Sequence, residues 1–371
     1  MTFLGIDLHS NNFICCFLFS DNKKKELHSF SLNPDSLKVF YKLLSDDTYV
    51  MLEASTNTFK FVDLIKDRVR EVFVANTHKL KLISMVKRKT DRIDSEKLAL
   101  YLKMQVTSGE SLVKPVYVPE QTIRDLRSLF STYKLLRKNI GSLKNRIHSL
   151  LKQNLFPFTK QFIFGKGMRE AIFNLPMDDI LKYQLTLLYD QLDHFEEAVE
   201  ELKKKVLLTT APFHNQIDIL TSMKGISVFT AAALIADIAT VKRFPNSKNF
   251  TSYLRSAPGV DSSNGETRVL HTTKFGRKLS VTLLSQSLNH FRDRNPKLNR
   301  WYNRVSSYKP KGKIRMALCR RVLTEIYQML KKQEYHYFRD IENHKRKMIE
   351  YYNLLHQHGI TIENRYYKKT A

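Results

Sequence analysis

The chain has 371 residues, 42% of them hydrophobic, which is enough for two or three domains with buried cores and excludes a disordered polypeptide. Its 62 basic and 36 acidic residues give a net charge of +26, which favours nucleic acid as a partner, although a merely basic protein has the same composition. The three cysteines have no disulfide or zinc-site spacing, as expected in a reducing cytoplasm, and no run of about 18 apolar residues predicts a membrane span.

Residues 1 to about 110 are predicted to fold as an α/β domain. Strands are expected at 3–8, 12–19 and 26–32, followed by a helix at 35–45, a strand ending at Glu53, a helix at 58–69 and a strand at 72–74. Three antiparallel strands followed by alternating helices and strands is the order of an RNase H-like (RuvC-like) fold.

Four acidic residues lie at the ends of these predicted elements: Asp7, Glu53, Asp91 and Asp94. Asp7 and Glu53 interrupt apolar runs that are neighbours in such a sheet, while Asp91 and Asp94 share one face at the start of a helix. Convergent carboxylates repel one another unless cations lie between them. The pattern therefore predicts two Mg²⁺ ions, or Mn²⁺, about 4 Å apart, for phosphoryl transfer. A single acidic residue at such a position is more often a cap or turn residue than a metal ligand.

A second region, residues 119–207, is predicted to form two long helices. Apolar residues recur every three or four positions from Leu126 to Leu150 and again from Leu181 to Val206, which predicts coiled-coil packing. Pro157 and Pro176 break the region into an antiparallel pair. The two helices pair either within one chain or across a dimer, and the sequence leaves both arrangements open.

The remaining chain is predicted to be mainly helical. An Ala-rich helix from Val228 to Ala239 follows Gly225, as in half of a helix-hairpin-helix or at any ordinary helix start. The stretch 257–279 is polar and predicted to be a loop. The last hundred residues are basic and helical, and aromatic side chains such as Trp301 among the cations suit a nucleic-acid surface.

Three segments of the first domain resemble a known family: Gly5-Ile6-Asp7, Leu52-Glu53-Ala54-Ser55 and Thr90-Asp91-Arg92-Ile93-Asp94-Ser95-Glu96-Lys97-Leu98-Ala99. They look like the DEDD transposases of bacterial insertion sequences, a group that includes Piv-type DNA invertases and bridge-RNA-guided serine recombinases. The later half agrees, because Gly225-Ile226, residues 230–238, and Pro258 to Gly265 followed by Lys274-Phe275-Gly276 resemble that family's C-terminal domain and serine loop. The resemblance spans nearly the whole chain.

The resemblance implies four parts: a RuvC-like DEDD catalytic domain at 1–112, a helical coiled-coil hairpin at 113–212, a C-terminal transposase domain with the serine loop at 213–345, and a basic tail at 346–371. The implied partners are element-end and target DNA, a bridge RNA, and further copies of the chain in a dimer or tetramer. The implied location is the bacterial cytoplasm, at the nucleoid.

The resemblance also implies a serine nucleophile that forms a covalent protein–DNA intermediate. Ser263 falls at that position, with Ser262 as the alternative, although Asn264 stands where the family usually has glycine. Lys274, Gly276 and Arg277 are expected to contact the attacked phosphate. His271 is expected to be a loop or phosphate-contacting residue rather than a general base.

Two other functions fit the same residues. A hydrolytic nuclease of the junction-resolving type would use the four carboxylates with water as the nucleophile and would not need Ser263. A non-catalytic nucleic-acid-binding protein would bind without metal and cleave nothing.

Overall fold

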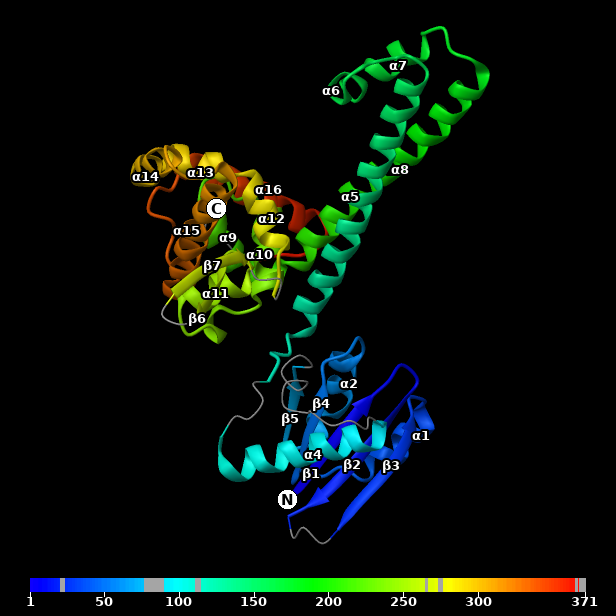
Figure 1. The fold of residues 1–371 in the computed structure, drawn as a ribbon, viewed down its shortest axis with the longest axis vertical. Coiled ribbons are helices and arrows are strands. Elements are labelled where there is room, and N and C mark those ends of the chain that lie inside the picture. The colour runs from blue at the N-terminus through cyan, green and yellow to red at the C-terminus, as the bar shows by residue number, and fades with distance from the viewer. Residues whose placement is uncertain are drawn as a thin grey trace, which may run out of the picture. The chain divides into compact units, whose positions relative to one another are not determined.

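The computed structural model describes residues 1–20, 24–76, 90–110, 115–263, 266–272, 276–363 and 366. The chain divides into two compact units, Met1–Pro119 and Glu120–Ala371, and each has its own hydrophobic cores (Figure 1). In the described residues, no helix is both long and apolar enough to cross a membrane.

The first unit contains a mixed sheet of five strands. Its elements in chain order are β1 (Thr2–Leu8), β2 (Asn12–Phe19), β3 (Lys25–Ser31), α1 (Pro34–Tyr41), β4 (Thr48–Glu53), α2 (Thr58–Ile65), the 3₁₀ turn η1 (Lys66–Arg68), β5 (Glu71–Ala75) and α4 (Asp91–Ser108). The strand order is β3-β2-β1-β4-β5, with β1, β4 and β5 parallel and the other two pairings antiparallel. This order is compatible with the expected RNase H-like fold.

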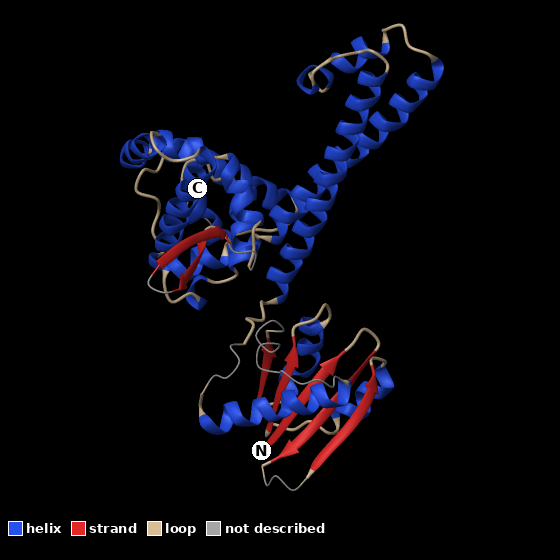
Figure 2. Ribbon diagram, in the orientation of Figure 1, coloured by secondary structure: helices blue, strands red, loops and turns tan. Residues whose placement is uncertain are grey.

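Alternation along the strands divides the first unit into two apolar layers. One face of the sheet carries Leu4, Ile6 and Leu52, which pack with Phe40 of α1 and Phe61 of α2. The opposite face carries Phe3 and Met51, which pack with Leu98 and Leu102 of α4. Helix α4 therefore packs across this face of the sheet, against β1, β2 and β4 (Figure 2).

The second unit is mostly helical. Its helices are α5 (Gln121–Gln153), α6 (Lys160–Ile163), α7 (Met168–Phe173), α8 (Asp179–Thr209), α9 (His214–Thr221), α10 (Val228–Ile238), α11 (Ser247–Tyr253), α12 (Leu279–Gln286), α13 (Leu288–Arg294), α14 (Pro296–Ser306), α15 (Lys311–Lys332) and α16 (Ile341–Gln357). Two 3₁₀ turns, η2 (Ala211–Phe213) and η3 (Val241–Arg243), and one strand pair, β6 (Pro258–Ser263) with β7 (Glu266–Thr272), complete it.

The two longest helices, α5 and α8, pack against each other within the chain and run in opposite directions (Figure 1). Their contact buries apolar residues at the predicted spacing, and Lys144 Nζ of α5 lies 2.6 Å from Glu196 Oε1 of α8. The two helices thus pair with each other in one chain. True coiled-coil packing, and the finer division of this unit into parts, stay predictions.

The Ala-rich helix α10 forms the centre of the larger core, because every residue from Thr230 to Ile238 is buried. Ser227 caps its start, since the serine Oγ accepts a hydrogen bond from the amide of Thr230 at 3.1 Å. Helices α5, α9 and α12 contact α10. Gly225, just before the cap, has a φ of +95°, a left-handed value that favours glycine.

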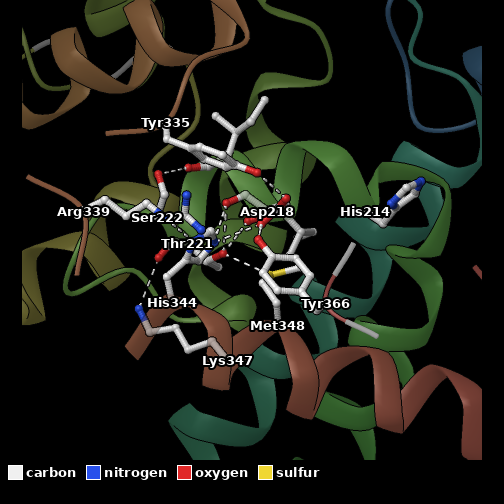
Figure 3. Close-up of polar contacts among 12 residues, drawn as sticks. His214, Asp218, Thr221, Ser222, Tyr335, Arg339, His344, Lys347, Met348 and Tyr366 are labelled. Carbon is white, nitrogen blue, oxygen red and sulfur yellow. Dashed lines mark hydrogen bonds and ion pairs between the residues drawn. The ribbon is translucent and has the colours of Figure 1, made fainter. Parts of the chain in front are cut away.

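A buried polar network joins α9 to the C-terminal helix (Figure 3). The carboxylate of Asp218 accepts from Tyr335 Oη at 2.8 Å and from Tyr366 Oη, and it lies 3.0 Å from His344 Nε2. Arg339 Nε donates to His344 Nδ1 at 2.8 Å, so the ring proton sits on Nε2 and points at Asp218. The network satisfies a carboxylate that is only 4% exposed.

Helix α16 belongs to the same core. Met348, Tyr351, Tyr352 and Leu355 are buried, and burial raises the pKa of Tyr351 to about 12. Residues 341–357 therefore form a helix, as expected for the last hundred residues, and its apolar side packs into the core.

Candidate metal centre and serine hairpin

Asp7 and Glu53 stand at equivalent positions on two adjacent parallel strands. The last residues paired between β1 and β4 are Ile6 and Leu52. Asp7 directly follows Ile6 in β1, and Glu53 directly follows Leu52 in β4. Because side chains alternate along a strand, Asp7 lies on the same face as Phe3, and Glu53 on the same face as Met51. That face is the one covered by α4.

Gly5 lets α4 approach this face closely. A β-carbon at Gly5 would lie 2.1 Å from the carbonyl oxygen of Ser95 and 2.4 Å from the amide nitrogen of Ala99. Any other residue at this position would push the helix away from the strand. The glycine of the Gly5-Ile6-Asp7 segment thus sets the distance between the start of α4 and the end of β1.

The first turn of α4 supplies Asp91 and Asp94. The turn begins at Thr90, whose Oγ1 accepts a hydrogen bond from the amide of Ile93 at 3.3 Å. The exposed amides and the dipole at a helix start stabilise negative charge there. Lys97 Nζ lies 3.6 Å from Asp94 Oδ1, so the ammonium group of Lys97 faces this carboxylate. Both acidic residues therefore also serve as helix-start residues.

His9 brings the strand end and the helix start together. Its Nε2 lies 3.5 Å from Asp7 Oδ2 and 3.3 Å from Asp91 Oδ2. One ligand atom from each of Asp7, His9 and Asp91 lies within 4.8 Å of the other two. His9 Nε2 is itself shielded from solvent, and among the described residues it meets these two carboxylates without forming a hydrogen bond.

The backbone around His9 is fixed on both sides. The amide of His9 donates to the carbonyl of Asn12 at 2.9 Å, and Asn57 Nδ2 donates to the carbonyl of His9 at 2.8 Å. Asn57 directly precedes α2, which follows Glu53. Thr58 Oγ1 in turn donates to the carbonyl of Glu53 at 2.8 Å. The loops after β1 and β4 are therefore tied to each other at the edge where the carboxylates gather.

The donor set fits a divalent cation. Two carboxylates and an imidazole within ligand distance of one another are groups that bind Mn²⁺ and related ions, and carboxylates alone suit Mg²⁺. Glu53 and Asp94 do not join the Asp7–His9–Asp91 group, although both belong to the described chain. Of the four carboxylates predicted to converge, Asp7 and Asp91 are thus within joint ligand reach.

The sequence did not indicate that His9 would join this group. The pattern that could have indicated it is that His9 lies two residues after Asp7. In an extended strand, side chains two residues apart point to the same face of the sheet. It was overlooked because the strand was expected to end at residue 8, and a histidine after a strand is usually a surface residue.

The predicted polar loop at 257–279 contains a two-stranded hairpin instead. Strands β6 and β7 pair antiparallel, with Ser262 opposite Thr267 and Ser263 opposite Glu266. The β-branched residues Val260, Thr267 and Val269 favour extended backbone even in this polar sequence. Ser263 is the last residue of its strand, at the hairpin turn. The side chains of Ser262, Ser263 and His271, and all of Lys274, lie outside the described residues.

Gly276 and Arg277 follow the hairpin on a tightly packed backbone. Gly276 has a φ of +101°, and a β-carbon there would lie 2.1 Å from the carbonyl oxygen of Tyr253. The amide of Arg277 donates to that same carbonyl at 2.9 Å. The Arg277 side chain lies 3.9 Å from the buried carboxylate of Asp237, whose other oxygen accepts from the amide of Ser280 at 2.9 Å. A fixed carboxylate therefore faces this guanidinium.

Two further arginines gather at the C-terminal end of α10. Arg127 Nε donates to the carbonyl of Ala236 at 2.7 Å, and Arg243 Nε donates to that of Ile238 at 3.0 Å. Burial first, and then the positive charges of Arg277 and Arg243, lower the pKa of Arg127 to about 10. Three guanidinium groups beside one carboxylate leave a positive local charge near the serine hairpin.

Comparisons with known proteins agree on one kind of protein. A family model of DEDD transposases of the IS110 type, described as a transposase, matches residues 4–157, and a second model, described as the transposase IS116/IS110/IS902 family, matches residues 217–303. The chain is also 24% identical over 259 residues to the transposase for insertion sequence element IS1533 from Leptospira borgpetersenii, across 66% of this chain and 72% of that protein.

Proposed function

Because the chain belongs to the IS110 family of DEDD transposases, we propose that it cuts and rejoins DNA at the ends of an insertion sequence by metal-assisted phosphoryl transfer. One observation carries this proposal: the end of β1 and the start of α4 present Asp7, His9 and Asp91 as a group of ligands. The alternative of a non-catalytic binding protein gives no reason for such a group in a chain with a net charge of +26.

In this proposal Asp7, His9 and Asp91 hold one divalent cation, Mg²⁺ or Mn²⁺, and Glu53 and Asp94 are the remaining ligands of a two-ion site. The ions would polarise the scissile phosphodiester and neutralise the charge that develops on its oxygens. The start of α4 supports the site, because its dipole helps to hold two acidic residues close together. Lys97, 3.6 Å from Asp94, keeps the excess negative charge small when the ions are absent.

Ser263 is proposed as the nucleophile, with Ser262 as the alternative. Its oxygen forms a bond to a DNA phosphorus, the bond from that phosphorus to one strand oxygen breaks, and the serine proton ends on the released strand hydroxyl. One phosphodiester replaces another, so the reverse attack reseals a strand without a nucleotide cofactor. Arg277, fixed by Asp237, together with Gly276 and Lys274, is proposed to contact the attacked phosphate.

The assembly is proposed from the family resemblance. Element-end and target DNA are paired by an element-encoded bridge RNA, and the chain acts as a homodimer or homotetramer. The hairpin of α5 and α8 mediates this assembly as a coiled coil within the part 113–212, and residues 213–345 form the transposase domain proper.

The experiment is a strand-cleavage assay on element-end DNA with Mg²⁺ and any RNA transcribed beside the gene. Asp91→Asn is compared with Asp35→Asn, because Asp35 also occupies the first turn of a helix but is 93% exposed and, among the described residues, belongs to no group of three ligands. Cleavage that needs the metal, is lost in Asp91→Asn and persists in Asp35→Asn supports the proposal. Equal cleavage in EDTA, or a wild-type rate in Asp91→Asn, overturns it.

A further inference from the structure

Helix α14 and the first half of α15 belong to a segment that contains no acidic residue. From residue 294 to residue 324 the chain carries ten basic residues and no acidic one. Lys297, Arg300 and Arg304 are exposed on α14, and Arg321 is exposed on α15. In the described parts of the chain, none of these four side chains forms an ion pair with a carboxylate. Their charge is therefore available to an external polyanion.

The cations of α14 surround the single tryptophan of the chain. Lys297, Arg300, Trp301 and Arg304 line an open cleft of about 310 Å³. Their spacing of three and four residues places them on one side of the helix, while Leu298 and Val305 are buried on the other. The cleft thus combines three positive charges with an indole ring, and no carboxylate lines it.

The tryptophan is held in place by its neighbours. The guanidinium of Arg321 lies 4.2 Å from the Trp301 ring centroid, and that of Arg292 lies 4.9 Å from the ring of Tyr302. Both aromatic rings also pack partly against the main core of the second unit. The indole is therefore a preorganised platform rather than a freely rotating side chain, which reduces the entropy lost when a flat ligand stacks on it.

We propose that this cleft binds a single-stranded segment of nucleic acid, with phosphates on Lys297, Arg300 and Arg304 and an unpaired base against Trp301. A single strand fits better than a duplex, because only an unstacked base can reach an aromatic ring, whereas a duplex offers the cations its phosphates alone. The inference rests on the proposed function only for its biological role. Binding at this cleft needs neither the carboxylates nor Ser263.

The test is a fluorescence titration of the full-length protein in EDTA, so that cleavage cannot interfere. Since Trp301 is the only tryptophan of the chain, emission excited selectively at the red edge of the tryptophan absorption band, where the 17 tyrosines absorb little, reports on this cleft. The probes are a twelve-residue deoxythymidine strand, a twelve-residue uridine strand and a duplex of the same length. We expect saturable quenching by a single strand, with affinity that falls as salt rises at a log–log slope of about −2, for three phosphates at about −0.7 each.

Variants separate the charges from the ring. Arg300→Gln and Arg304→Gln should each weaken binding of a labelled strand roughly 3- to 10-fold and make the salt dependence less steep by about 0.7. Lys332→Gln, at the far end of α15 and 61% exposed, is the matched control and should change neither. Trp301→Phe keeps an aromatic ring in the core and should weaken binding less than Trp301→Ala, for which a loss of about 5-fold or more is expected.

The outcomes decide the proposal. Quenching by both strands supports a shared backbone-and-stacking site, and quenching by one of them assigns the site to RNA or to DNA. Three results would overturn the proposal. They are tryptophan emission that does not change at a saturating concentration of single strand, tighter binding of the duplex than of the single strands, and binding by Arg300→Gln that equals binding by Lys332→Gln. Because no metal is present, a failure here leaves the catalytic proposal standing, and a catalytically dead Asp91→Asn variant should still quench.

Discussion

The two units of this protein hold their candidate chemical groups in different ways. In the first unit, Asp7, Glu53 and Asp91 stand at the last residues of buried strands or the first residue of a helix, so the packing of regular elements fixes them. In the second unit, Ser263 is the last residue of β6, which belongs to a sheet of only two strands. A site built on buried elements is rigid before its ligand arrives, whereas a hairpin end is held mainly by its own backbone.

The two units also differ in charge. The first brings the carboxylates of Asp7 and Asp91 together beside His9, and the second has a segment of 31 residues, 294–324, that contains no acidic residue. We interpret this as a division of labour, in which acidic groups recruit cations for chemistry and basic groups hold nucleic acid. If the two roles are separate, a substitution in one unit leaves the function of the other unit intact.

The largest effect is expected from Glu53→Gln. It keeps the size of the side chain but removes the charge at the end of β4, and strand cleavage should fall on the order of 10²–10³-fold, as when one preorganised electrostatic group is lost. Glu71→Gln is the matched control, since Glu71 is exposed at the opposite end of the adjacent parallel strand. The measurement is the rate of strand cleavage by the two variants in Mg²⁺, and circular dichroism verifies that both are folded. Equal rates for the two variants would contradict the role of Glu53.

Gly5→Ala should disturb the packing of α4 on β1. Because its β-carbon would meet backbone atoms at 2.1 and 2.4 Å, the helix must shift, and we expect about 1–3 kcal/mol of lost stability with weaker Mn²⁺ binding. Gly141→Ala is the control, since it lies in the middle of α5 with nothing within 4 Å and should stabilise by about 0.5–1 kcal/mol. Thermal or urea unfolding measures both, and a Gly5→Ala protein as stable as wild type would contradict the packing argument.

His9→Ala should lower the affinity for Mn²⁺ about 10- to 100-fold, the range typical for loss of a group that holds or orients a metal ligand. His28→Ala provides the comparison, because His28 also lies near a carboxylate, 3.6 Å from Glu26, but belongs to no group of three ligands. Titration followed by the electron paramagnetic resonance of free Mn²⁺ gives the two affinities. If both variants bind Mn²⁺ as wild type does, His9 is not part of the site.

A smaller effect, a loss of folding stability, should appear in alkaline solution. Burial raises the pKa of the Cys15 thiol in the first unit and of the Cys319 thiol in the second to about 12 each. Between pH 9 and 12 the unfolded chain loses these protons while the folded chain keeps them. Stability is therefore fully present below pH 9 and falls with rising pH, by about 1 kcal/mol between pH 9 and 10 for each thiol.

The pair of cysteines tests whether the units unfold separately. Cys15→Ala should flatten the alkaline decline of the first unit's unfolding transition and leave that of the second, and Cys319→Ala should do the reverse. Urea unfolding at pH 8, 9 and 10, followed by fluorescence for the second unit and by circular dichroism for the whole chain, gives the slopes. A single transition that responds equally to both variants would show that the units are coupled.

The sequence predicted the main helices and strands because the spacing of their apolar residues is regular. Apolar runs bounded by turns marked β1, β2 and β4, and apolar spacing of three and four marked α5 and α8. The same patterns placed Asp7 and Glu53 at strand ends. Burial alone is enough to specify such positions, because a shift by one residue would turn the apolar side chains of a strand to the wrong face.

Other features depend on contacts between distant segments. The approach of α4 to Gly5, and the meeting of His9 with Asp91, join residues more than eighty positions apart. The hairpin of β6 and β7 was read as a loop because its residues are mostly polar and its strands are short. The buried Asp218–His344 network was invisible for the same reason as the His9 contact, since neither histidine has a local motif.

The most direct test of the whole account is a covalent-trapping assay with Mg²⁺, element-end DNA and any RNA transcribed beside the gene. Wild type is compared with Ser263→Ala, Ser262→Ala and Glu53→Gln by denaturing electrophoresis of labelled DNA. The account predicts a protein–DNA adduct in wild type and Ser262→Ala that is absent from Ser263→Ala and Glu53→Gln. Cleavage without any adduct, unchanged by either serine substitution, would contradict it and identify a hydrolytic nuclease.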